Sequence, residues 1–261
     1  MSAAPEYLLI DISNSFTKVS PANAAALVGE TARLATRSLS ATTLTQAAGP
    51  PQSYRAVVLS SVVPAAVAAV EAYLATAPAG AAAPRLLCVG PALRLGIGID
   101  YPDPASIGAD RLANAAGAAL FYGAPAIVVD FGTALTFDVI AEAEHGPTYT
   151  GGVIAPGLEA MTHYLHQRTA LLPKIDLHEP VAAIGKSTRD AMLAGAVYGY
   201  RGLVREILHA ITRELCPAAA RPPTVVATGG YAELIAREMP EIARVDPRLT
   251  LEGLRVIATL N

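Results

Sequence analysis

The sequence has few charges and no strongly basic segment. Only 16% of its 261 residues are Asp, Glu, Lys or Arg, whereas 52% are hydrophobic. This balance excludes a disordered chain and is typical of a folded protein with a substantial core. Because the net charge is only −3 and no basic run is present, nucleic acid is not favoured as a partner.

Cysteines and long apolar segments are also scarce. The two cysteines, Cys88 and Cys216, lie far apart and form no C-x-x-C pair, which argues against a disulfide framework or a cysteine zinc site. The longest apolar stretch is interrupted by Asp130 and Gly132, so it predicts no membrane span. The N-terminus lacks the basic and apolar regions of a signal peptide. We therefore expect a cytoplasmic protein that does not bind membranes.

Strand-like and helix-like segments alternate along the chain. Apolar runs predict strands at residues 7–12, 56–63, 85–89, 126–131, 135–140, 150–155 and 224–227. One helical pattern begins at Pro64, and four others cover residues 109–121, 157–170, 187–215 and 231–238. Strands mixed with crossover helices predict an α/β architecture.

One strand–turn–strand pattern occurs twice. Residues 11–17 (DISNSFT) align with residues 130–136 (DFGTALT): a buried strand ends in Asp, a turn of small and hydroxyl residues follows, and an apolar strand resumes. The repeat suggests a duplicated fold with one copy in each half. Coincidence is the alternative, because Asp/Gly/Ser turns commonly connect strands.

Both turns suit phosphate chemistry. Small residues let backbone N–H groups approach phosphate oxygens, and Ser and Thr hydroxyls add donors. An Asp at the strand end can hold hydrated Mg²⁺, which binds through one or two carboxylates plus substrate phosphates. The turn at residues 228–230 (TGG) opens a helix and would suit a nucleotide.

These motifs, in this order, resemble the actin-like sugar kinase/heat-shock ATPase superfamily. Within it, nearly the whole chain resembles the type III pantothenate kinases. The segments that carry this resemblance are LLIDISNSFTK, Tyr101 followed by SIGADR (residues 106–111), VVDFGTALTFDV, GGVIAPGLEAM, IGKST and TGGYAELI.

The resemblance implies an α/β protein with a duplicated actin-like (ribonuclease H-like) ATPase fold, two similar halves with mixed sheets. We expect these halves at residues 1–118 and 119–261. It also implies ATP-dependent phosphorylation of pantothenate to 4′-phosphopantothenate, the first step of coenzyme A biosynthesis. Mg²⁺ and a monovalent cation, K⁺ or NH₄⁺, are implied as cofactors, and a homodimer as the assembly.

The resemblance further implies specific site residues. Asp110 would accept the proton of the pantothenate hydroxyl. The implied pantothenate site consists of Tyr101, Gly108, Ala109, Asp110, Arg111 and Thr188. The implied nucleotide site consists of Asp11, Ile12, Ser13, Asn14, Ser15, Phe16, Thr17 and Lys18, with Thr133 from the second turn. Asp11 would hold Mg²⁺ directly or through water, and Asp130 would bind the monovalent cation.

Several of these residues have simpler explanations. Asp110 could complement the dipole of the helix that begins there, and Asp130 could cap a turn. Arg111 could form a surface ion pair, although its two parallel donors suit the carboxylate of pantothenate. Tyr101 could be a packing aromatic.

The first turn also departs from the family pattern, with Ser13 in place of Gly and Ser15 in place of Thr. The alternatives are therefore a weak or inactive accessory protein, or a related kinase with another small-molecule substrate.

Overall fold

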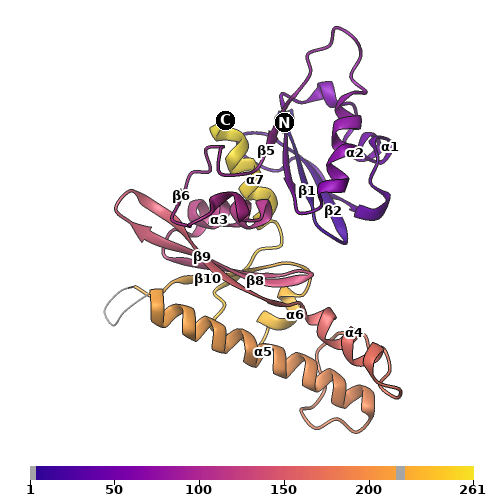
Figure 1. Ribbon diagram of the computed structural model, residues 1–261, viewed down its shortest axis with the longest axis vertical. Helices are drawn as coiled ribbons and strands as arrows, with labels where there is room; N and C mark the ends of the chain where they lie inside the picture. Colours follow the sequence, from indigo (N-terminus) through magenta and orange to yellow (C-terminus); the bar gives the residue numbers. More distant parts are fainter. Residues whose placement is uncertain (1–3, 216–220) are drawn as a thin grey trace. The chain divides into compact units, whose positions relative to one another are not determined.

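The chain forms two compact units, each of which can be followed in Figure 1. The computed structural model describes residues 4–215 and 221–261, so Cys216 lies outside the described residues. The first unit comprises the described residues up to Phe121, with Ala143–Thr150 and Arg248–Asn261; the second comprises Tyr122–Glu142 and Gly151–Pro247. Two segments of the first unit, Ala143–Thr150 and Arg248–Asn261, come from the later part of the chain. A division of the sequence into two consecutive halves does not include them in the first unit.

Two mixed sheets organise the chain and confirm the predicted α/β class. The first has the strand order β3-β2-β1-β4-β5, and the second has the order β11-β10-β7-β8-β9-β6. The strands of the first sheet are β1 (Tyr7–Ile12), β2 (Phe16–Ala22), β3 (Ala32–Ala35), β4 (Ala56–Ser61) and β5 (Arg85–Cys88). Those of the second are β6 (Gly98–Ile99), β7 (Ala126–Phe131), β8 (Ala134–Ala143), β9 (Gly146–Pro156), β10 (Thr224–Thr228) and β11 (Arg244–Val245).

Helices cover both faces of the first sheet. Helices α1 (Ala41–Ala48) and α2 (Pro64–Leu74) bury Leu44, Val70 and Tyr73 against one face. Helix α7 (Leu249–Leu260) packs on β1 and β4 from the other side (Figure 1). Because successive side chains of a strand point to opposite faces, β1 is buried on both sides, as its uninterrupted apolar sequence predicts.

Helix α7 also holds α3 (Ala109–Tyr122) through an unusually close backbone contact. A Cβ atom at Gly253 would lie 1.8 Å from the carbonyl oxygen of Ala113, which leaves no room for any side chain. Beside this contact, the Thr250 hydroxyl donates to Oδ1 of the buried Asn114 at 2.8 Å. Helix α3, which carries Asp110 in its first turn, is therefore fixed to the first sheet through α7, a helix that the sequence patterns did not identify.

The predicted duplication is confirmed in the strand pairing. In each copy the first strand pairs antiparallel with the next one, β1 with β2 and β7 with β8, and parallel with a later one, β4 or β10. The second hairpin is one residue shorter, because Asp11 faces Lys18 whereas Asp130 faces Thr136. The gapless alignment of residues 11–17 with residues 130–136 is therefore wrong after the turn. Thr136 pairs with Asp130, whereas Thr17 pairs with Ile12 and lies on the face opposite to Asp11.

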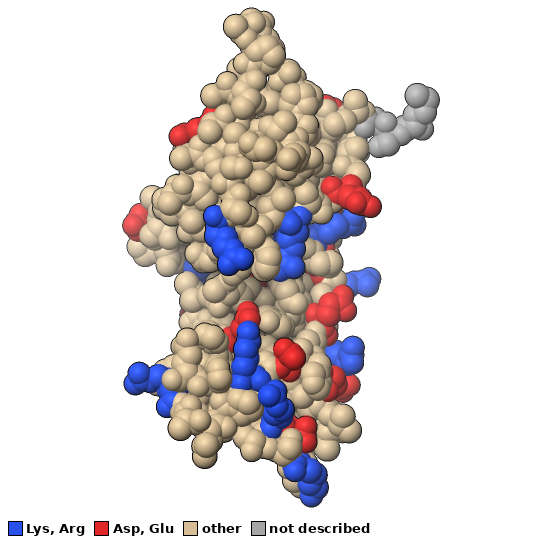
Figure 2. All heavy atoms as spheres, turned by 90° about the vertical axis from the view of Figure 1, so that its right-hand side faces the viewer, with Lys and Arg blue, Asp and Glu red and all other residues tan. Residues whose placement is uncertain are grey.

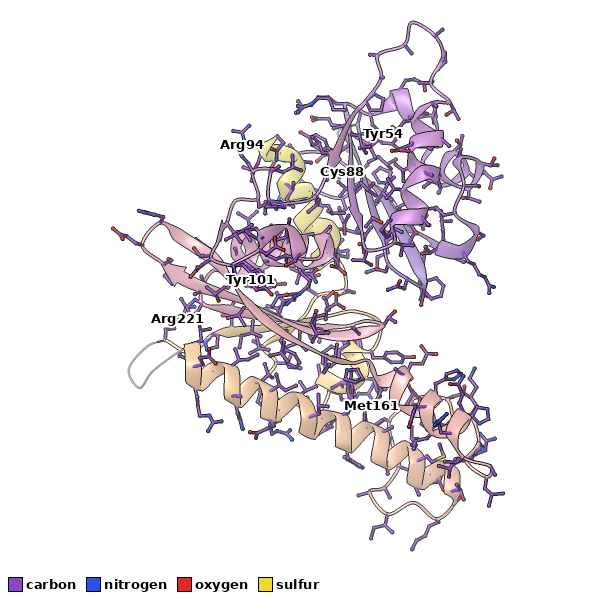
Figure 3. All side chains as sticks on the ribbon, viewed as in Figure 1. Tyr54, Cys88, Arg94, Tyr101, Met161 and Arg221 are labelled. Carbon is purple, nitrogen blue, oxygen red and sulfur yellow. The ribbon has the colours of Figure 1, made fainter. Side chains whose placement is uncertain are left out.

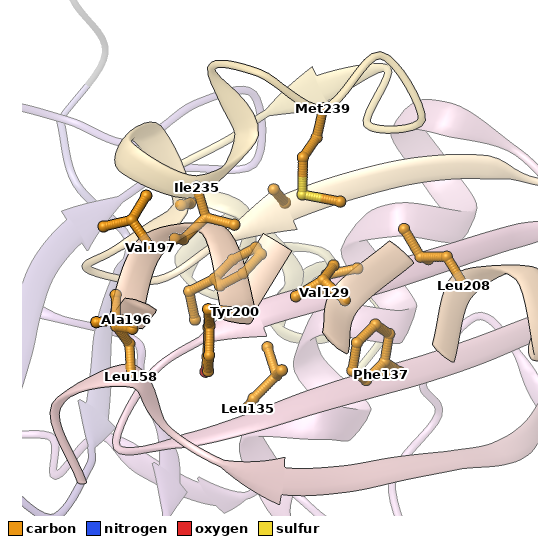
Figure 4. Close-up of a cluster of buried hydrophobic side chains, with 14 of the residues drawn as sticks. Val129, Leu135, Phe137, Leu158, Ala196, Val197, Tyr200, Leu208, Ile235 and Met239 are labelled. Atoms are coloured by element: carbon orange, nitrogen blue, oxygen red, sulfur yellow. The ribbon is translucent and has the colours of Figure 1, made fainter. Parts of the chain in front are cut away.

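The core of the second unit lies between its sheet and α5 (Thr188–Leu215), as Figure 4 shows. Strand residues such as Val129 and Phe137 meet helix residues such as Val197 and Leu208. Two shorter helices complete the unit: α4 (Leu158–Arg168) and α6 (Ala232–Ala236).

A buried arginine ties α5 to α6. Arg201, 3% exposed, donates from both terminal nitrogens to the carboxylate of Glu179, at 2.9 and 2.7 Å. It also donates to the carbonyl oxygens of Leu234 and Ile235 in α6, at 2.8 and 3.1 Å. The hydrogen bonds from Arg201 lower the pKa of Glu179. This network joins the segment before α5 to the helix that follows the TGG turn.

Charges of both signs share the surface. On the face drawn in Figure 2, acidic and basic side chains lie beside one another. Among the described residues, no helix combines the length and apolar character that crossing a membrane requires.

We predict that Gly253→Ala strongly destabilises the protein, because the added methyl group would overlap the Ala113 backbone and force α7 away from α3. Overpacking of this kind costs about 1–3 kcal/mol or more, so thermal denaturation should show a clear fall in Tm. Gly90→Ala is the control, since nothing lies within 4 Å of a Cβ atom there. Equal Tm values for the two variants would show that Gly253 does not pack against the Ala113 backbone as closely as described.

Candidate functional site

The first turn closes the β1–β2 hairpin with an exposed tip. The Ser13 N–H donates to the carbonyl oxygen of Phe16 at 3.1 Å, and Asn14 and Ser15 between them are exposed. Ser13, like every other described non-glycine residue, has a negative φ. A side chain at this position therefore introduces no backbone strain, although the family has Gly there.

Thr36, in the short helical turn Thr36–Ser38, braces this tip from outside the motif. Its hydroxyl donates to the carbonyl oxygen of Ser13 at 2.7 Å, and its N–H donates to that of Ser15 at 3.1 Å. The hydroxyls of Thr36 and the buried Thr17 lie 3.0 Å apart. Thr36 was missed from sequence because only the pairing of β2 with β3 brings it beside the turn.

Asp11 is held where β1 ends. Its side chain is buried, 4% exposed, and accepts a hydrogen bond from the hydroxyl of Ser60 at 3.1 Å. Ser60 is the register partner of Asp11 on β4, and Lys18 is its partner on β2. The adjacent Ile12 is fully buried in the core of the first unit. The carboxylate thus has a fixed position, which a metal-binding or phosphate-binding role requires.

Asp110 lies in the first turn of α3, two residues after Gly108, where a side chain would collide with the Asp110 carboxylate. A Cβ atom at Gly108 would lie 2.6 Å from Oδ1 of Asp110, and the Arg111 N–H donates to the same oxygen at 2.8 Å. Burial raises the pKa of Asp110, while the hydrogen bond and the charge of Arg111 act in the opposite direction. A fixed carboxylate with a raised pKa is suited to accept a proton.

Two tyrosines extend the surroundings of Asp110. The rings of Tyr101 and Tyr149 meet edge to face with centroids 6.1 Å apart, and the guanidinium of Arg111 lies 5.7 Å from the Tyr149 ring. Figure 3 labels Tyr101 at the strand β6 side of α3. Tyr101 therefore packs against another aromatic ring, which was the simpler explanation for this residue. Because that ring, Tyr149, also lies near Arg111, the same contact places Tyr101 near Arg111. Tyr149 was not predicted, because β6–β9 pairing brings it here from a distant segment.

In the second unit, glycines bring three turns together at the end of β7. A Cβ atom at Gly157 would lie 2.2 Å from the carbonyl oxygen of Thr133. One at Gly229, where φ is +94°, would lie 2.5 Å from Oδ1 of Asp130. The TGG turn and the start of α4 thus pack directly against the second Asp turn, and Thr133 is exposed at its tip. Exposed turns of small residues, with backbone N–H groups close together, suit the approach of phosphate oxygens.

Thr188 is the first residue of α5, and its side chain is exposed. Ser187 caps this helix, since its hydroxyl accepts from the Asp190 N–H at 3.1 Å. Gly185 packs so closely on the first turn that a Cβ atom there would lie 2.2 Å from the Ala191 nitrogen. The GKST segment therefore forms the start of α5.

The structure groups the predicted site residues in two sets. The first unit carries Asp11 to Lys18 and the Tyr101, Gly108, Ala109, Asp110 and Arg111 set, whereas the second unit carries Asp130, Thr133 and Thr188. Each of these residues belongs to, or directly adjoins, a strand end, a turn or a helix start. The roles assigned to them stay predictions.

Comparison with known proteins identifies the family. A family model described as type III pantothenate kinase matches residues 7–210. A type III pantothenate kinase from Akkermansia muciniphila is 51% identical over 257 residues, which are 98% of this chain and 99% of that protein. The motifs that suggested this family therefore belong to a similarity that extends over almost the whole chain.

Solved structures support the fold. A protein from Sinorhizobium meliloti, provisionally assigned as a 2-dehydro-3-deoxygalactonokinase, matches with a TM-score of 0.59 at 16% identity over 97% of this chain and 98% of that one. The ethanolamine utilization protein EutJ from Carboxydothermus hydrogenoformans matches with a TM-score of 0.54 at 14% identity over 100% and 91%. These likenesses concern the fold alone, and they agree with the expected actin-like ATPase architecture. The family model and the 51% identical relative show that this chain belongs to the type III pantothenate kinase family.

Proposed function

We propose that this chain transfers the terminal phosphoryl group of ATP to pantothenate, giving 4′-phosphopantothenate, the first step of coenzyme A biosynthesis. The observation that carries the proposal is the constrained Asp110 carboxylate beside Arg111, in a chain that belongs to the type III pantothenate kinase family. The expected cytoplasmic location accompanies this function and stays a prediction.

Asp110 accepts the proton of the attacking hydroxyl and orients that hydroxyl toward the phosphate. Phosphoryl transfer depends mainly on positioning and on stabilisation of charge, so the fixed geometry of Asp110 matters as much as its basicity. Arg111 binds the carboxylate of pantothenate through parallel hydrogen bonds. Tyr101, Gly108, Ala109 and Thr188 complete the pantothenate site.

The first turn binds the phosphates of ATP through backbone N–H groups, the Ser15 hydroxyl and the Lys18 ammonium, and Thr133 contacts the nucleotide. Asp11 would hold Mg²⁺ and Asp130 a monovalent cation. Oxygen donors fit both ions, and no cluster of three or more metal-ligating side chains occurs among residues 4–215 and 221–261. Mg²⁺ that keeps most of its waters would need only one or two carboxylates from the protein, such as Asp11, and it would supply positive charge next to the phosphates.

Ser13 does not favour the accessory-protein alternative. Its negative φ shows that the turn forms without glycine, and its carbonyl oxygen is held by Thr36. The first turn therefore forms without backbone strain despite its serine, which supports the proposed phosphate site.

The family resemblance also leads us to propose a homodimer, and α5 offers a surface for it. Gly195, Gly199 and Gly202 lie on an exposed face of this helix with nothing within 4 Å of a Cβ atom, and Tyr198 on the same face is 42% exposed. Each such glycine costs the helix about 1 kcal/mol relative to alanine, and no close contact among the described residues explains it. Sedimentation velocity tests the proposal, and a monomer at micromolar concentration would contradict it.

The proposed reaction is tested by coupled ADP release. We expect turnover that depends on pantothenate and Mg²⁺ and that increases with K⁺ or NH₄⁺. If folded protein releases ADP no faster with pantothenate than without it under all these conditions, the proposed function is excluded. Turnover with a different acceptor from a substrate panel would exclude pantothenate as the substrate.

We predict that Asp110→Asn lowers turnover by about 100-fold or more, the contribution of a positioned proton acceptor. Because the folded state raises the pKa of this carboxyl, its ionisation opposes folding as pH rises above the usual aspartate value. The variant should therefore be at least as stable as the wild type near neutral pH, and this difference should vanish in acid, where both side chains are neutral. Thermal denaturation across pH and the same ADP assay measure both effects; unchanged turnover would remove Asp110 from the reaction.

We predict that Gly108→Ala reduces kcat by about tenfold to 100-fold, because displacement of a reacting group by about 1 Å costs that much. The new methyl group would push the Asp110 carboxylate away, while the fold remains because only a side-chain terminus must move. Steady-state kinetics with a Tm measurement check this, with Gly90→Ala as the matched control. Wild-type kcat in the Gly108 variant would show that the contact does not position the carboxylate.

A further inference from the structure

A row of polar residues crosses the first sheet beside the first turn. Ser60 on β4, Asp11 on β1, Lys18 on β2 and Arg33 on β3 are successive register partners. Register partners point to the same face of a sheet. The carboxylate of Asp11, the ammonium of Lys18 and the guanidinium of Arg33 therefore share one face. We call these four residues the charged row.

The charged row contains two cations in direct opposition. Lys18 and Arg33 are paired across β2 and β3, an arrangement in which like charges destabilise a sheet. Neither forms an ion pair with a carboxylate within residues 4–215 and 221–261. The one acid in the row, Asp11, is buried and accepts from Ser60. A bound anion would relieve this repulsion.

An aromatic ring holds Arg33 at the turn. Its guanidinium carbon lies 3.5 Å from the centroid of the Phe16 ring, and Phe16 is the last residue of the turn. Phe16 is 41% exposed and Arg33 is exposed as well, so the cation is displayed toward solvent rather than buried in a structural pair. Stacking fixes the plane of the guanidinium and leaves its edge donors available.

We propose that Arg33 is a second phosphate-binding cation of the first turn, contacting the terminal phosphates of the nucleotide together with Lys18. The proposal rests on the proposed function of this turn. The ligand is a polyphosphate chain, because Arg33 has the Lys18 ammonium as its register partner and lies on the Phe16 ring of the same turn, which together present two positive charges at the turn. The planar fork of Arg33 can bind two phosphate oxygens at once, which Lys18 cannot do.

The test variant is Arg33→Gln, which keeps most of the stem but removes the charge. Arg55→Gln is a matched control, since Arg55 also lies over an aromatic ring, that of Tyr7, with its guanidinium carbon 5.4 Å from the centroid. Tyr7 begins β1, about 17 Å from the end of this strand beside the turn. Binding of the non-hydrolysable analogue AMPPNP with Mg²⁺ and of AMP alone is measured by calorimetry, which requires no turnover.

We expect Arg33→Gln to weaken AMPPNP binding about tenfold, the loss typical of a hydrogen bond to a charged group, and to leave AMP binding unchanged. In the ADP assay the KM for ATP should rise while the KM for pantothenate stays constant. Arg33→Lys should restore part of the affinity, and Arg55→Gln should match the wild type.

AMPPNP affinity within twofold of the wild type would overturn the proposal, as would an equal loss for AMPPNP and AMP. Because calorimetry does not depend on the acceptor, these results hold even if pantothenate proves not to be the substrate. If the wild type shows no pantothenate-dependent ADP release but the variants change AMPPNP binding as expected, the result counts against the proposed reaction and not against the role of Arg33.

Discussion

The backbone contact between Gly253 and Ala113 is the constraint on which the geometry of the first unit depends. It fixes α3 to α7, and α7 packs on β1 and β4, the strands that carry Asp11 and Ser60. The Asp110 carboxylate, in the first turn of α3, is thereby placed relative to the first turn by rigid elements instead of a loop. Catalytic positioning needs such rigidity because small displacements cost large factors in rate.

Three glycines leave space for polar groups of the predicted site residues. Gly108 leaves room for the Asp110 carboxylate, Gly157 for the Thr133 carbonyl group, and Gly229 for the Asp130 carboxylate. In the second unit, the buried Arg201 of α5 donates to the carbonyl oxygens of Leu234 and Ile235 in α6. Because a buried donor left without its acceptors is costly, these hydrogen bonds anchor the helix after the TGG turn.

Electrostatics in the first unit are arranged for an anion. Lys18 and Arg33 are adjacent cations, and Asp11 is kept buried by Ser60 beside them. Asp110, in contrast, has its pKa raised by burial while Arg111 limits the rise. One carboxylate thus suits a metal ion near phosphates and another suits proton acceptance, although both are aspartates close to a strand or helix end.

The sequence by itself determined the α/β class, the duplicated Asp turns and the motifs that indicate the family, because strand periodicity and short motifs are local properties. The helix over residues 249–260 was missed, as was the one-residue difference between the hairpins, since register depends on pairing across the sheet. Only the tertiary structure brought Thr36, Ser60, Tyr149 and Arg33 to the site. Each of them comes from a segment distant in sequence, and strand pairing, which no local pattern encodes, sets its neighbours.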